Sequence, residues 1–103
     1  NDVTKILAST GAVLGTFPAG TTPYSIAFDG GGYATSASAF DAATYIWVSD
    51  NGSASVSRID TKTGSTVATY PVGAKPRGIV FDGTSVWVIN AGNNTVTRIT
   101  PLR

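Results

Sequence analysis

The sequence predicts an all-β fold made of repeated, four-stranded antiparallel sheets. The first observation is a recurring motif: Val-Thr-Lys-Ile at residues 3–6 returns as Val-Ser-Arg-Ile at 56–59 and as Val-Thr-Arg-Ile at 96–99. The second is that no segment carries apolar residues at helical spacing, whereas glycine, proline and threonine occur throughout. The third is the period of roughly 40 residues, which is typical of a β-propeller blade.

The repeat extends well beyond this motif. Residues 17–30 and 70–83 share an aromatic-Pro-x-Gly sequence followed by Phe-Asp-Gly, and Ile-Trp-Val at 46–48 matches Val-Trp-Val at 86–88. The two pairs of segments are offset by different lengths because the first copy carries additional residues. We therefore predict an insert at residues 31–43.

Each complete copy contains four strand-like stretches. Residues 79–81 form the first, and we expect burial on both faces because it is apolar throughout. Asp82-Gly83 then predicts a tight hairpin with left-handed backbone. The second strand is expected at 86–89, and the Asn-rich residues 90–94 form the next turn.

The third strand is predicted at residues 96–99, where branched side chains suit a pleated sheet. The fourth corresponds to residues 66–70 of the preceding copy. It is more polar, as expected of an outer edge, and Pro71 ends it by removing a hydrogen-bond donor.

The whole chain, residues 1–103, is interpreted as one repeat region with incomplete ends. It contains a half unit at 3–20, a full unit at 23–72 that includes the insert, and a partial unit at 76–100. About two blades cannot close a ring, because propellers typically need 4–8. We therefore expect copies to associate head to tail, with three copies giving six blades. The alternative is that these residues belong to a longer propeller chain.

The pattern P-x-x-I-x-F-D-G, W-V, V-x-R-I-D, T-G and T-Y-P-V-G resembles the repeats of YVTN-type and NHL-type β-propellers, the group that includes virginiamycin B lyase-like proteins. The resemblance covers residues 3–99 except the insert. It implies a propeller fold. Families with such repeats include surface-layer proteins, interaction scaffolds and a few enzymes, so the resemblance leaves the function open.

Composition argues against several functional classes. With 7 basic and 6 acidic residues the net charge is +1, which does not favour nucleic acid as a partner. No apolar run is long enough to span a bilayer. Low charge with abundant Thr, Ser, Asn and Gly favours an extracellular or cell-surface location.

Residue types also argue against catalysis. Histidine and cysteine are absent, so the usual nucleophile–base pairs cannot form. Lyases of the resembling group use a histidine base and a metal, and no histidine is available here. We therefore predict no catalytic residue, no metal and no cofactor.

Rim loops are the candidate binding surface. In the propeller layout that the resemblance implies, loops 19–23, 49–55, 72–76 and 89–95 lie on one rim, where loops commonly carry function. Their polar groups and one aromatic ring suit a sugar or peptide, although the same residue types also form turns. The candidate ligand-binding residues are Tyr24, Asp50, Asn51, Lys75, Arg77, Asn90, Asn93 and Asn94.

The two tryptophans, Trp47 and Trp87, occupy the same position of the repeat. They could stack on a ligand or, as the apolar neighbours favour, pack between blades. The function favoured by the sequence is a non-catalytic binding or scaffold module that assembles with itself into a closed propeller and has a protein or glycan ligand. Alternatives are a lectin-like carbohydrate-binding propeller, a fragment of a virginiamycin B lyase-like enzyme without its catalytic residues, and a propeller piece that only assembles.

Overall fold

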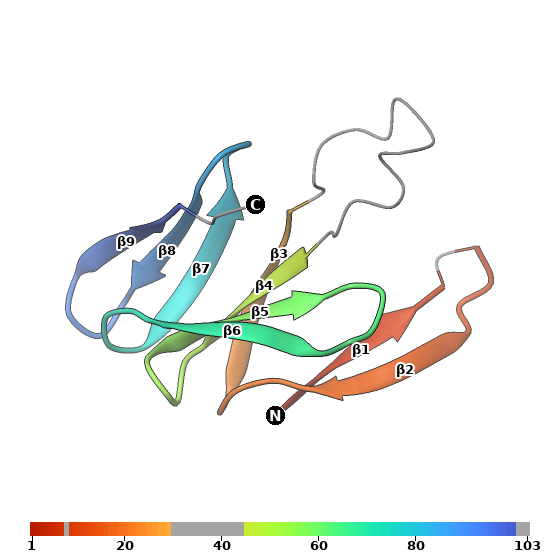
Figure 1. Ribbon diagram of the computed structural model, residues 1–103. Coiled ribbons are helices and arrows are strands. Elements are labelled where there is room, and N and C mark those ends of the chain that lie inside the picture. Colours follow the sequence, from red (N-terminus) through yellow and green to blue (C-terminus); the bar gives the residue numbers. More distant parts are fainter. Residues whose placement is uncertain (8, 30–44, 101–103) are drawn as a thin grey trace.

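The computed structural model describes residues 1–7, 9–29 and 45–100, and the predicted insert at 31–43 lies outside them. The described chain is all-β, as predicted, and forms three antiparallel sheets (Figure 1). The strands are β1 (Asp2–Ile6), β2 (Val13–Pro18), β3 (Pro23–Asp29), β4 (Tyr45–Asp50), β5 (Ser55–Asp60), β6 (Thr66–Pro71), β7 (Pro76–Phe81), β8 (Val86–Asn90) and β9 (Thr95–Ile99).

Each sheet is a meander in which consecutive strands pair. The sheets are β1-β2, β3-β4-β5-β6 and β7-β8-β9. The central sheet has the predicted four strands in the predicted order, and the polar strand β6 is its outer edge. Strand β7 packs along β3 and β4, so the third sheet lies against the central one, while the β1-β2 hairpin lies on the other side (Figure 1).

The turns follow the predicted chemistry. Gly83 has φ of 106°, a left-handed conformation that side chains disfavour. Asp82 fixes this turn, because its Oδ1 accepts hydrogen bonds from the backbone N–H groups of Thr84 and Ser85 at 2.8 Å each. In the Asn-rich turn, Asn94 adopts φ of 58°, as residues of this type tolerate.

The hydrophobic core lies between the central sheet and the third sheet. Trp47 and Val56 project from the central sheet, and Trp47 also stacks on Tyr70 with ring centroids 5.4 Å apart. The third sheet contributes the apolar side chains Ile79, Val86, Val88 and Ile99. Burial of these faces is the main force that joins the two sheets.

The expectation that residues 79–81 are buried on both faces is wrong. Ile79 is 7% exposed, but its neighbour Val80 is 59% exposed. Successive side chains of a strand point to opposite faces. Within the described residues the third sheet is covered on one face only, so Val80 meets solvent on the other.

No helix in the described ranges is long and apolar enough to cross a membrane.

Candidate functional site

The predicted rim loops are held together in pairs by backbone hydrogen bonds. The N–H of Asn51 donates to the carbonyl of Thr22 at 2.9 Å, which joins loop 49–55 to loop 19–23. In the same way, the N–H of Ala91 donates to the carbonyl of Lys75 at 3.1 Å. Thr22 and Lys75 both have φ of 51°. The two loop pairs therefore share one conformation and present a defined surface.

Two of the eight candidate residues, Asp50 and Asn90, are buried inside these loop pairs. Asp50 accepts hydrogen bonds from Ser57 Oγ at 2.6 Å and from the backbone N–H of Gly20 at 3.1 Å. Asn90 Nδ2 donates to Thr97 Oγ1 at 2.8 Å. Both side chains connect the end of a strand to its neighbours. The sequence contained a signal for this role, because hydroxyl residues stand opposite both positions in the next strand.

Replacing Asp50 by alanine is expected to lower the free energy of unfolding by about 1–3 kcal/mol, because the buried hydroxyl of Ser57 and the half-buried N–H of Gly20 lose their acceptor. Asp50→Asn is the matched control, since asparagine occupies the equivalent position 90, and it should lose less. Urea unfolding followed by circular dichroism measures both changes. Equal losses in the two variants would show that the hydrogen bonds of Asp50 are not what stabilises the loops.

The other six candidates lie nearer the surface. Tyr24, Lys75, Arg77, Asn93 and Asn94 are exposed, and Asn51 is half-buried and donates from Nδ2 to the carbonyl of Pro76 at 3.1 Å. The guanidinium of Arg77 lies 5.4 Å from the centre of the Tyr24 ring. A shallow hollow of about 180 Å³ adjoins Tyr24, smaller than the pockets of roughly 300–1,000 Å³ that enclose drug-sized ligands.

The two tryptophans have similar immediate surroundings but different exposure. Trp47 Nε1 donates to Asp29 Oδ2 at 3.3 Å, and Trp87 Nε1 donates to Asp82 Oδ2 at 2.6 Å. The bond from Trp87, followed by the backbone donors of the turn, holds the pKa of Asp82 well below its usual range. Trp47 is 0% exposed and packs in the core, as the sequence favoured, whereas Trp87 is 37% exposed.

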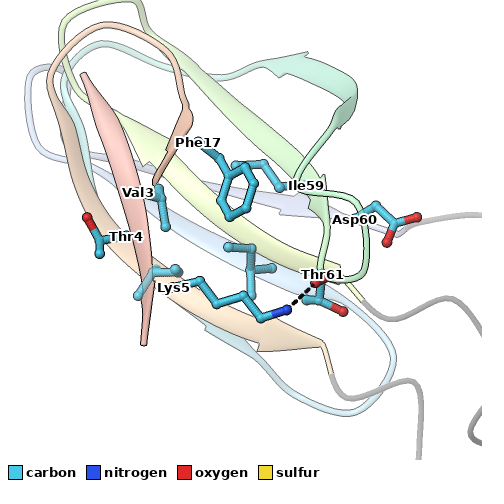
Figure 2. Close-up of a pocket in the computed structure, with 10 residues that line it drawn as sticks. Val3, Thr4, Lys5, Phe17, Ile59, Asp60 and Thr61 are labelled. Carbon is cyan, nitrogen blue, oxygen red and sulfur yellow. Dashed lines mark hydrogen bonds between the residues drawn. The ribbon is translucent and has the colours of Figure 1, made fainter. Parts of the chain in front are cut away.

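An apolar cavity of about 200 Å³ lies between the β1-β2 hairpin and the central sheet (Figure 2). Beside the cavity, a hydrogen bond of 3.0 Å from Lys5 Nζ to the carbonyl of Thr61 joins β1 to the turn that follows β5. The cavity is too small for a typical drug-sized ligand. The residues that line it are Val3, Thr4, Lys5, Phe17, Ile26, Ile46, Ile59, Asp60, Thr61 and Gly64.

This cavity was not predicted from the sequence, although the repeat contained the signal. Its isoleucines at 26, 46 and 59 are the repeat equivalents of Ile79, Val86 and Ile99, which pack against Trp47 in the core. On the cavity side no equivalent of Trp47 is present, because the β1-β2 hairpin has only the third and fourth strands of a unit. As a result Ile26 is 52% exposed.

Within the described ranges, no group of three or more His, Cys, Asp or Glu residues could hold a metal ion.

The chain matches no protein-family model, and no curated protein is significantly similar to it.

Proposed function

We propose that this chain is a building block of a β-propeller. Several copies associate head to tail into a closed ring, and the ring is a non-catalytic scaffold. The observation that carries the proposal is the unequal exposure of Trp47 and Trp87, which share one repeat position. The central sheet has a neighbour over its tryptophan, and the third sheet has a similar face with no neighbour within the described residues.

Both flanks of the chain expose apolar side chains in rows. The outer face of the third sheet presents Val80, Trp87, Ile89 and Val96, and the opposite flank of the central sheet presents Tyr24, Ile26 and Phe28. Contiguous exposed apolar surface of this kind commonly marks a protein–protein interface. Because the two flanks differ, each contact is heterologous, and repeated contacts of one kind form a ring when the rotation closes.

The scaffold's binding surface in this proposal is the rim. Every copy contributes the same two loop pairs, so a ring repeats the exposed groups of Lys75 and Arg77 once per copy. A protein or glycan ligand would then meet several identical weak sites at once, which raises the overall affinity without new contacts.

Native mass spectrometry tests the assembly. We expect a discrete species of three chains, each of 10.5 kDa. Because the exposed flanks are mainly apolar, the species should persist at high salt, where surface charge pairs are screened. A folded monomer at micromolar concentration would contradict the proposal.

A further inference from the structure

We infer that the copies join by exchange of a strand: β9 of one copy pairs with β2 of the next, displaces β1, and carries Trp87 into the apolar cavity of that copy. The inference rests on the proposed ring and concerns its seam, the contact between one copy and the next.

Three strands of the chain, β1, β5 and β9, carry the same motif. Of these, β5 has a paired strand on both edges, with β4 on one and β6 on the other. Within the described residues, β9 pairs with β8 alone, so its other edge is open, and an open edge is a template for another strand. Strand β2 is the repeat equivalent of β6, the strand that this edge accepts.

The register supports the same match. In the β1-β2 pair Thr4 lies opposite Thr16, and in the β5-β6 pair the equivalent Ser57 lies opposite Thr69. The repeat places Thr97 of β9 at this same position. A β9–β2 pair in the seam therefore puts Thr97 opposite Thr16, and no residue has to change face.

Strand β1 is displaced from β2 in this exchange because it makes fewer stabilising contacts than β9. Every side chain of β1 is exposed except the half-buried Val3. In β9, by contrast, Ile99 is buried in the core, and Asn90 Nδ2 donates to the hydroxyls of both Thr95 and Thr97. Release of β1 removes its three residues that line the cavity, Val3, Thr4 and Lys5, at the expense of the exposed hydrogen bond from Lys5 to the carbonyl of Thr61. Their repeat equivalents in β9 take the same places.

The cavity then receives Trp87. In the core, Trp47 stacks on Tyr70 and packs against the side chains of the next sheet. The cavity holds Phe17, the repeat equivalent of Tyr70, together with the isoleucines at 26, 46 and 59, but its chain supplies no tryptophan there. Trp87 of a second copy would stack on Phe17 as Trp47 stacks on Tyr70.

The flank and the cavity fit each other better than they fit an unrelated partner, because the chain already contains the same contact once. The exposed residues Val80, Trp87 and Val96 are the equivalents of Ala27, Trp47 and Val56, all of which lie in or against the core. The occupant of the cavity is therefore a second copy of this chain.

Disulfide trapping tests the seam directly. The chain has no cysteine, so introduced pairs are the only thiols. In the seam variant Thr16→Cys/Thr97→Cys, opposed strand residues bring the two Cα atoms within the range that a disulfide requires. Mild oxidation is expected to join separate chains, and non-reducing electrophoresis should show a ladder of multimers that a reductant collapses.

The matched control is Thr4→Cys/Thr16→Cys, which shares one cysteine with the seam variant. Its disulfide closes within one chain and locks β1 onto β2. The oxidised form is expected to be a monomer in native mass spectrometry, and reduction should restore the mass of the wild-type assembly.

The outcomes separate the seam from the ring. If wild-type protein assembles but the seam variant forms no interchain disulfide, or if the locked control assembles unchanged, the strand exchange is wrong while the ring stands. If wild-type protein is a folded monomer, the ring and the seam both fail. An interchain ladder together with a monomeric locked control supports the seam.

Discussion

Replacement of Trp47 by alanine is expected to lower the free energy of unfolding by about 3–5 kcal/mol, the usual cost of removing a buried indole from a core. Trp47 is fully buried, stacks on Tyr70 and donates a hydrogen bond to Asp29. Domains of this kind are stable by only about 5–15 kcal/mol. Urea unfolding followed by circular dichroism should therefore show a sharply lower midpoint or no folded baseline.

Trp47→Phe is the control for this change, since it keeps an aromatic ring on Tyr70 and removes the indole N–H. A smaller loss is expected, because most of the packing remains. If Trp47→Ala unfolded at the same urea concentration as the wild type, the core between the central and third sheets would not be the main source of stability.

The same change at the equivalent position, Trp87→Ala, is expected to leave the chain folded and to dissociate the assembly. Trp87 lies on the uncovered face of the third sheet, so its removal leaves the core of the single chain intact. At an interface, a buried tryptophan commonly contributes 2 kcal/mol or more, which is about 30-fold in the affinity of each seam. Sedimentation velocity should show the shift from assembly to monomer.

Comparison of the two alanine variants is the informative control, because the residue type and the repeat position are identical. Trp87→Phe should weaken the assembly less than Trp87→Ala. Unchanged mass for Trp87→Ala, or unfolding as severe as that of Trp47→Ala, would contradict the different roles assigned to the two residues.

Much of the local structure could be predicted from the sequence. The repeat aligned the strands with one another, and Asp82-Gly83 identified a hairpin because few residue pairs accept its backbone. The polar character of β6 identified an outer edge. Each of these features depends on the preferences of a few neighbouring residues, which the sequence displays.

Exposure could not be predicted in the same way. Val80 and Ile89 are apolar and lie in regular strands, yet both are exposed. Hydrophobicity indicates that a side chain favours burial, but the cover comes from another sheet, and the third sheet has its cover on one face only within the described residues. Trp47 and Trp87 differ for the same reason.

The structure joins the predicted binding loops in pairs, and ligand binding by them stays a prediction. Asp50 and Asn90, which were candidates for that binding, are instead buried supports of the loops. Their short polar side chains look like turn formers in sequence, although each is followed seven residues later by a hydroxyl residue, Ser57 or Thr97, which the strand pairing brings beside it. The cavity was missed because it lies where the β1-β2 hairpin lacks the first and second strands of a complete repeat unit.

Iodide quenching of tryptophan fluorescence across a dilution series tests the central claim most directly, because the chain has only two tryptophans. At concentrations where the protein assembles, both indoles should be protected; on dilution to monomer, Trp87 alone should become quenchable. One tryptophan that remains quenchable at every concentration, including those at which the assembly is intact, would contradict the burial of Trp87 between copies.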